Sequence, residues 1–164
     1  MYRDQPSYAG EVDHRALIES LTAARYTGWA LSASARSLRD ILPLCPPGTH
    51  VCAWVKPIGV PTATRGLHYR WEALLVVGGR QRPPGVLDWL SAMPARLGGS
   101  DLIGRKPLAF CSFLFRALGM LPGDELVDLF PGTGIVSRAW DEVNRSSPLE
   151  QRRLNAAATT GVVG

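Results

Sequence analysis

The residues best suited to binding a ligand form a short turn near the carboxyl end of the chain. Residues 128–134 read Asp-Leu-Phe-Pro-Gly-Thr-Gly and follow the apolar pair 126–127. An apolar strand that ends in a glycine turn and opens a helix is an arrangement that binds adenosyl cofactors. Gly132 and Gly134 have no Cβ, so the backbone can approach a ligand closely. Taken alone, the turn indicates only a strand, a turn and a helix, because many α/β proteins make such turns without a ligand.

Two other nucleotide-binding sequences are excluded at this turn. No Gly-Lys-Ser/Thr follows it, so it is not a P-loop, and Ser137 stands where a dinucleotide fingerprint has its third glycine. The upstream sequence adds to the pattern. Lys106-Pro107 opens an amphipathic helix, with the proline suited to the first turn, and Leu-Pro-Gly-Asp at 121–124 leads into the strand.

This ordered combination resembles the permuted DNA amino-methyltransferases, which methylate adenine N6 or cytosine N4. The likeness covers roughly residues 13–143, because Trp-Val-Lys-Pro at 54–57 and Tyr-Arg-Trp-Glu at 69–72 are similar to the paired late strands of that family. The resemblance implies that S-adenosylmethionine is the cofactor and that Phe130 contacts its adenine ring. The implied cofactor-binding residues are Lys106, Pro107, Asp128, Phe130, Gly132, Thr133 and Gly134.

Three of the residues that the resemblance singles out also have a purely structural interpretation. Phe130 taken alone is a core aromatic, and Lys106 is a solvated lysine at a helix start. Glu72 matches the acidic position before an apolar strand in the family, but a charge on the exposed face of a strand explains it equally well.

The catalytic tetrapeptide of the family, Asp/Asn/Ser-Pro-Pro-aromatic, does not occur in this sequence. Its polar groups orient the target amino nitrogen, and its aromatic side chain stacks the flipped base. The Pro-Pro pairs at 46–47 and 83–84 lack a suitable residue on either side and are interpreted as turns. In the family's order the tetrapeptide strand would lie upstream of Met1, between the strands at 126–130 and 29–32. We therefore expect either a longer natural product or an atypical pairing of these two strands.

The elements that must position these residues alternate between strand and helix. Apolar patterns predict strands at 29–32, 50–55, 69–77 and 126–130, with helices after Asp13 and around 38–42, 106–118 and 135–143. The alternation predicts an α/β, Rossmann-like methyltransferase fold with a mostly parallel sheet and permuted motif order, incomplete at its N-terminal central strand. We expect one methyltransferase-like domain over 1–146 and a flexible tail over 147–164.

The composition of the chain indicates the kind of protein and the compartment to expect. Hydrophobic residues make up 46% of the chain and charged residues 20%, which is an ordinary globular mixture. The three cysteines form no disulfide framework and favour a reducing compartment. Cys45, His50 and Cys52 lack a fourth ligand at metal-binding spacing, so buried or half-buried thiols are favoured over a metal site. No signal peptide or membrane span is evident, and we expect a cytoplasmic protein with no metal.

DNA is the partner that the resemblance implies, and the net charge of +4 permits it. The best candidates for phosphate contacts are arginines around the strand at 69–77, with a solvated basic loop as the alternative: Arg65, Arg70, Arg80 and Arg82. The leading hypothesis is a SAM-dependent methyltransferase-type domain that acts on an exocyclic amino group of a DNA base, with no catalytic residue assigned. The alternative is a catalytically inactive remnant that serves as a SAM-binding or interaction module.

Overall fold

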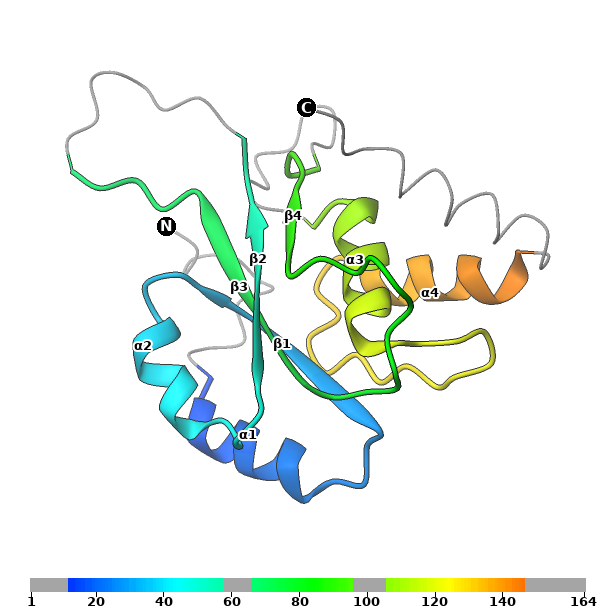
Figure 1. Cartoon of the computed structure of the whole chain (residues 1–164), viewed down its shortest axis with the longest axis horizontal. Coiled ribbons are helices and arrows are strands. Elements are labelled where there is room, and N and C mark those ends of the chain that lie inside the picture. The colour runs from blue at the N-terminus through cyan, green and yellow to red at the C-terminus, as the bar shows by residue number, and fades with distance from the viewer. Residues whose placement is uncertain (1–11, 58–65, 96–105, 147–164) are drawn as a thin grey trace.

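The computed structural model describes residues 12–57, 66–95 and 106–146, and a mixed sheet forms its centre. The four strands of this sheet lie in the order β1-β3-β2-β4. Figure 1 shows these strands between two groups of helices. The strands are β1 (Gly28–Ser34), β2 (His50–Val55), β3 (Trp71–Gly78) and β4 (Trp89–Ser91). The helices are α1 (His14–Ala23), α2 (Leu38–Ile41), the 3₁₀ turn η1 (Leu42–Leu44), α3 (Leu108–Leu118) and α4 (Ile135–Arg145).

The predicted mostly parallel, Rossmann-like sheet is wrong. The central strand β3 is antiparallel to both β1 and β2, and only β2 and β4 are parallel. A parallel pair needs a long crossover connection, usually a helix, whereas antiparallel strands need none. In the described residues no helix separates β2 from β3, so the alternation of strand and helix on which the prediction depended fails at this step.

The strand predicted at residues 126–130 also differs from the structure. These residues belong to no strand ladder, and β1 pairs only with β3 within the described part of the chain. The expected alternative, in which β1 and residues 126–130 close up and pair, is therefore not observed. Among the described residues, no strand lies beside the outer edge of β1 or beside residues 126–130.

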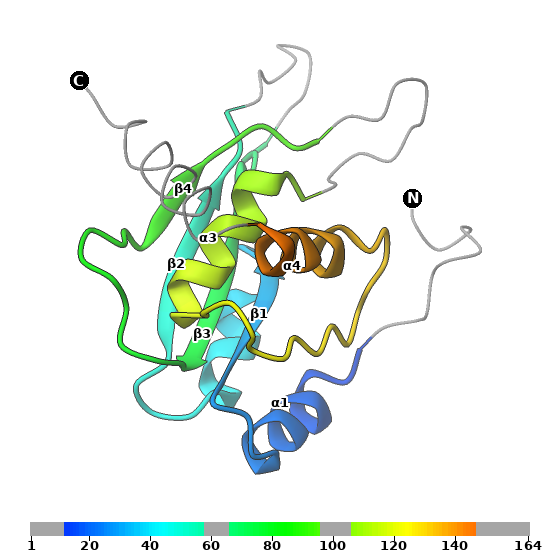
Figure 2. The same ribbon diagram turned by 90° about the vertical axis from the view of Figure 1, so that its right-hand side faces the viewer.

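Helices cover both faces of the sheet and create two hydrophobic cores (Figures 1 and 2). Successive residues of a strand face opposite sides, so β3 contributes to both cores. Leu74 and Val76 pack with Trp54 against α3 and α4, whereas Leu75 packs with Ile18 of α1 on the other face. Because all three β3 side chains are almost completely buried, β3 holds the two layers together.

The helix ends follow the sequence closely. The side chain of Asp13 caps α1 by accepting a hydrogen bond from the Ala16 N–H at 3.1 Å. Pro107 is the N-cap of α3, and Gly119 ends that helix in the left-handed region at φ 64°. Gly134 caps α4 at φ 67°. The helix predicted at 106–118 therefore ends at the expected glycine, whereas the helix predicted at 135–143 begins as expected and continues to Arg145. The tail predicted at 147–164 lies outside the described residues.

Candidate functional site

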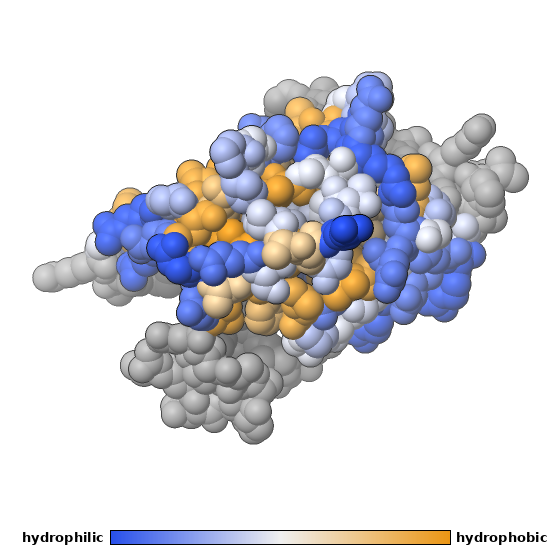
Figure 3. Space-filling model, turned by 90° about the horizontal axis from the view of Figure 1, so that it is seen from below, coloured by the Kyte–Doolittle hydropathy of each residue, from blue (hydrophilic) through white to orange (hydrophobic). Residues whose placement is uncertain are grey.

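A groove of about 920 Å³ separates β1 from residues 124–133. Its walls include all of β1 and the predicted cofactor turn, while α1 and α3 supply apolar side chains above and below. Figure 3 views the molecule from the end where α1 lies and shows patches of apolar surface beside hydrophilic side chains. Five of the exposed large hydrophobic residues are also groove residues, namely Val12, Tyr26, Val127, Leu129 and Phe130.

The turn at one wall of the groove is held by Asp128. Its carboxylate accepts hydrogen bonds from the Phe130 N–H and from the Ser137 hydroxyl, each at 3.2 Å. Because Ser137 belongs to α4, Asp128 fixes the turn to the helix that follows it. Asp128 therefore shapes the turn through its own side chain, which the sequence pattern alone did not specify.

The two glycines of the turn adopt conformations that other residues rarely adopt. Gly132 has φ 47° and Gly134 has φ 67°, both in the left-handed region. A Cβ on Gly134 would meet no atom within 4 Å, and one on Gly132 would meet only the Phe130 carbonyl at 3.8 Å. The backbone conformation, rather than crowding inside the protein, therefore requires glycine here, and the space beside the turn is open.

Phe130 is not a core aromatic. Its side chain is 54% exposed and lines the groove, so the structural interpretation weighed for this residue does not hold. An aromatic ring at this exposure leaves a large apolar face open to solvent. The face is available to a flat ligand.

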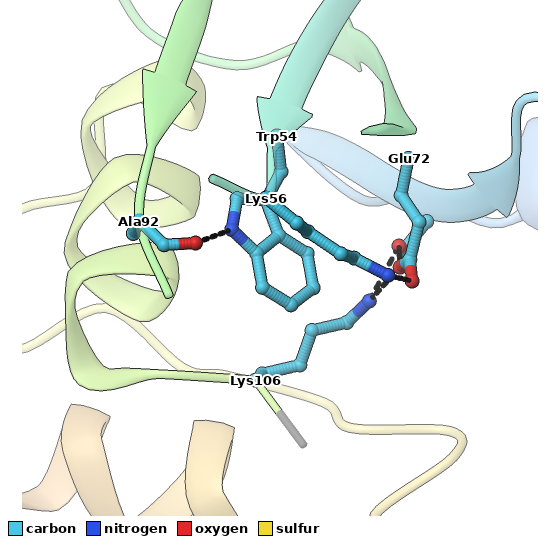
Figure 4. Close-up of polar contacts among 6 residues, drawn as sticks. Trp54, Lys56, Glu72, Ala92 and Lys106 are labelled. Carbon is cyan, nitrogen blue, oxygen red and sulfur yellow. Dashed lines mark hydrogen bonds and ion pairs between the residues drawn. The ribbon is translucent and has the colours of Figure 1, made fainter. Parts of the chain in front are cut away.

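Lys106 is not a solvated lysine either, because it joins a polar cluster at the groove. Its Nζ lies 2.6 Å from Glu72 Oε2 and donates to the Ser32 hydroxyl at 2.8 Å. Lys56 binds the other carboxylate oxygen of Glu72. Figure 4 shows the two lysines converging on Glu72 beside the ring of Trp54. Glu72, Lys56, Lys106 and Ser32 are named the lysine–glutamate cluster below.

Burial and charge act in opposite directions on the lysine–glutamate cluster. Burial raises the pKa of Glu72, but Lys106 and Lys56 together lower it further, so its pKa lies below the ordinary value. Burial lowers the pKa of Lys106, and Glu72 opposes that effect only in part. The lowered pKa keeps the Glu72 carboxylate ionised at neutral pH. Two lysines face this one carboxylate, so the formal charge of the cluster at the groove is net positive.

Aromatic rings surround the ammonium groups of the cluster. Lys106 Nζ lies 4.9 Å from the ring centroid of Trp54 and 4.7 Å from that of Phe110. Trp54 is fully buried and donates its indole N–H to the Ala92 carbonyl at 2.9 Å (Figure 4). Cation–π contacts of this kind partly compensate a cation for lost hydration. The lysine stem is therefore held in place rather than free to move.

The predicted arginine surface is not assembled in one place. Arg80 forms an ion pair with Asp124, and Arg82 donates from Nε to the Ala117 carbonyl at 2.7 Å. Both guanidinium groups are therefore used in internal contacts. Arg70 is exposed at the opposite end of β3, a strand whose length corresponds to roughly 26 Å. Arg65 lies outside the described residues. A DNA interface built from these arginines stays a prediction.

The structure brings most of the predicted cofactor residues to one groove. Five of the seven line it, namely Lys106, Asp128, Phe130, Gly132 and Thr133. The other two are at helix starts, since Pro107 caps α3 and Gly134 caps α4.

Ser32 and Phe110 were not predicted for the site, although both line the groove. A serine at the end of a strand and a phenylalanine inside an amphipathic helix have no distinguishing signal in a single sequence. Glu72 was interpreted either as the acidic position of the family or as a charge on the exposed face of a strand. In the structure it lies half-buried at the centre of the lysine–glutamate cluster.

The described ranges offer neither a metal-binding cluster nor a membrane-spanning helix. Residues 12–57, 66–95 and 106–146 contain no group of three or more His, Cys, Asp or Glu that could hold a metal ion. None of their helices is long and apolar enough to span a bilayer. Cys52 and Cys111 are buried free thiols, and burial raises the pKa of Cys111 to about 11.

Comparison of the chain with protein-family models and with curated proteins finds no match.

Proposed function

We propose that this chain binds S-adenosylmethionine in the groove between β1 and residues 124–133, as the cofactor-binding part of a methyltransferase that acts on an exocyclic amino group of a DNA base. The observation that carries the proposal is the convergence of Phe130, the open glycine turn and Lys106 on one groove.

The size and lining of the groove fit a nucleoside-type ligand. Its volume of about 920 Å³ lies within the roughly 300–1,000 Å³ typical of small-molecule sites. Phe130 would stack against the adenine ring, and the open space beside Gly132 would admit the ribose close to the backbone. These assignments account for an exposed aromatic side chain that the fold itself does not use.

Charge at the groove fits the amino-acid end of the cofactor. Ile135 and Val136, the first residues of α4, line the groove, and Gly134 provides no side-chain cap for that helix. The N–H groups of a first helical turn have no acceptor within the helix, and they favour an anion. They would hold the cofactor's carboxylate, with the net positive lysine–glutamate cluster adding favourable charge. When bound, the cofactor supplies an activated methyl group on a sulfonium sulfur.

The division of roles within the reaction follows from the missing tetrapeptide. The sequence contains no Asp/Asn/Ser-Pro-Pro-aromatic run to orient a target amino group. The residues of this chain are therefore proposed to bind and orient the methyl donor. The same absence favours a second candidate, a cofactor-binding module without catalytic activity of its own.

Calorimetry with S-adenosylhomocysteine tests the binding step. We expect saturable binding, and Phe130→Ala should weaken it by about tenfold, equivalent to about 1.4 kcal/mol. Leu67→Ala is the matched control, because Leu67 is also exposed and does not line the groove. No binding at millimolar ligand, or equal loss in both variants, would remove the proposal. Transfer of a tritiated methyl group to unmethylated DNA by the chain alone would exclude the inactive module.

A further inference from the structure

One face of the sheet is packed over only two of its four strands. The core that contains Ile18 and Leu75 is built from α1, β1, α2, β3 and the turn η1, and among the described residues no hydrophobic side chain of β2 or β4 joins it. Val51 of β2 is aligned with Leu75 and shares its face. Val51 is nevertheless 39% exposed, whereas Leu75 is completely buried. This face of the sheet is therefore open over β2 and β4.

Two tryptophans stand on this open face. Side chains alternate along a strand, and Leu90 of β4 packs on the α3 side, so its neighbour Trp89 points to the open side. Trp71, at the start of β3, is aligned with Val55 of β2 and shares a face with Leu75. Trp89 is 47% exposed and Trp71 is partly exposed. Because two strand spacings of about 4.8 Å separate β3 from β4, both rings belong to one surface.

Tyr69 adds a third ring to this surface. The Lys56 N–H donates to the Arg70 carbonyl at 2.7 Å, which continues the pairing of β2 with β3 beyond Trp71. Tyr69 therefore precedes Trp71 by one side-chain position on the same face, roughly 7 Å along the strand direction. Its side chain is 47% exposed, and the Arg36 guanidinium lies 4.9 Å from its ring centroid. The three rings are named the aromatic face below: Tyr69, Trp71 and Trp89.

Arginines accompany the aromatic face without a compensating charge. Arg36 stacks on Tyr69, and Arg70 lies between Tyr69 and Trp71 in the chain. Both arginines are exposed, and neither forms an ion pair with another described residue. The surface therefore combines flat apolar rings with free positive charge.

The carboxylates nearest in sequence are directed elsewhere. Asp88 precedes Trp89 but lies toward the other face, because burial and the charge of Asp88 raise the pKa of Cys52, which packs on the α3 side. Glu72 follows Trp71 but belongs to the lysine–glutamate cluster. Asp40 is paired with Arg39. No carboxylate of these three opposes an anion at the aromatic face.

We propose that the aromatic face binds single-stranded nucleic acid, with bases stacked on its rings and phosphates next to Arg36 and Arg70. Unpaired bases offer flat apolar faces to such rings, and stacking tolerates every base. Aromatic side chains on a four-stranded sheet stack two or three bases in this way. A protein partner would also cover the rings, but the two uncompensated arginines favour a polyanion. A duplex stacks its bases on one another and cannot offer them to the rings.

The aromatic face is separate from the groove. None of its three residues lines the groove, and β4 lies at the edge of the sheet opposite to β1 (Figure 1). The inference therefore goes beyond the cofactor site and does not depend on it. Binding of S-adenosylhomocysteine without binding of an oligonucleotide would retain the proposed function and remove this inference, and the reverse result would do the opposite.

Fluorescence anisotropy with a labelled oligothymidylate of about ten nucleotides tests the inference. We expect saturable binding that weakens as salt is added, because phosphate contacts release counterions. Trp89→Ala and Tyr69→Ala should each weaken binding about tenfold, whereas Trp89→Phe, which keeps a ring, should retain most of the affinity. Phe130→Ala is the matched control, because Phe130 is a similarly exposed aromatic residue that lines the groove. It should leave oligonucleotide binding unchanged.

Two further ligands separate stacking from charge. A duplex of the same length should bind at least about tenfold more weakly than the single strand, since its bases are already paired. Inorganic polyphosphate carries the charge without bases and should compete poorly with the oligonucleotide. Both Tyr69 and Trp89 are about half exposed, so their substitution should leave thermal unfolding nearly unchanged. If one variant does not fold, the other still decides the question.

Four results would overturn the inference. The first is no binding of the oligonucleotide at low salt, and the second is equal affinity for the duplex. The third is unchanged affinity in Trp89→Ala and Tyr69→Ala, which would leave only general attraction to a basic protein. The fourth is an equal loss in Phe130→Ala, which would place the strand in the groove.

Discussion

Lys106 Nζ lies 2.6 Å from Glu72 Oε2, which joins the start of α3 to β3 across the floor of the groove. Both side chains are largely buried, with 24% and 23% of their surface exposed. Removing one member of such a pair leaves the other charged and poorly hydrated. The fold and the candidate site therefore depend on the same ion pair.

Glu72→Gln should destabilise the protein because it leaves Lys56 and Lys106 facing each other without a counter-charge. Fully buried pairs lose about 3–5 kcal/mol when one partner is removed, and the partial exposure here reduces the expected loss to about 1–3 kcal/mol. Urea unfolding at neutral pH measures it. Glu142→Gln is the control, since its ion pair with Arg145 is exposed and should contribute less than about 0.5 kcal/mol. Equal effects of the two substitutions would contradict the structural role of Glu72.

Acid should weaken the folded state partly through Glu72. Its folded pKa lies below the ordinary value of 4.5, so the unfolded state binds more protons in that range. The stabilisation by Glu72 is present above that value and is lost as the pH falls through the lower folded pKa. Unfolding free energies measured from pH 6 down to pH 3 should decline more steeply in the wild type than in Glu72→Gln. Parallel curves would show that Glu72 titrates normally in the folded protein.

Gly132→Val should impair cofactor binding more than it impairs folding. The β-branched side chain is strained at φ 47°, and its bulk would enter the open space where the ribose is proposed to lie. Gly85→Val is a matched control, because Gly85 also has positive φ, 75°, with nothing near its would-be Cβ. Calorimetry should detect a loss of at least about tenfold in affinity only for the groove variant. Unchanged affinity in Gly132→Val would mean that the turn is purely structural.

Gly79→Ala should be among the most destabilising small substitutions in the chain. A Cβ at Gly79 would lie 2.5 Å from the Leu118 carbonyl oxygen, so α3 would have to move away from the end of β3. We expect a loss of more than about 2 kcal/mol by thermal or urea unfolding. Gly48→Ala has similar backbone strain at φ 82° but open space, and it should cost about 1 kcal/mol. Similar losses at the two positions would show that the contact with α3 can relax.

The local elements were predictable from sequence, but their pairing was not. The strand predicted at 50–55 matches β2, and Asp13 and Gly119 cap the predicted helices. The direction of the strands could not be predicted, because the apolar run in β3 suits either a parallel strand or a central antiparallel one. Its neighbours are residues far away in the sequence, and no local pattern specifies them.

Only part of the candidate site was predictable, because local motifs are visible in the sequence and contacts between distant residues are not. The glycine turn and Lys106 carry motifs that a single sequence displays, and both line the groove. Glu72 was ambiguous because its meaning depends on two lysines from other elements. Ser32 had no signal, since its role arises only when β1 lies beside β3. Arg80 was predicted for phosphate, whereas its partner is Asp124, which lies 44 residues further along the chain.

Arg80 also fixes the spacing between two walls of the groove. Its backbone N–H binds the Leu118 carbonyl at 3.0 Å, while its guanidinium binds Asp124 at the start of the opposite wall. Arg80, which follows β3, therefore contacts the end of α3 through its backbone and the opposite wall of the groove through its side chain. These contacts fix the spacing between the three elements. A site whose spacing is set in advance loses little conformational entropy on binding. The groove should consequently act as a preorganised receptor, in which affinity depends on complementarity to the ligand rather than on the cost of closing around it.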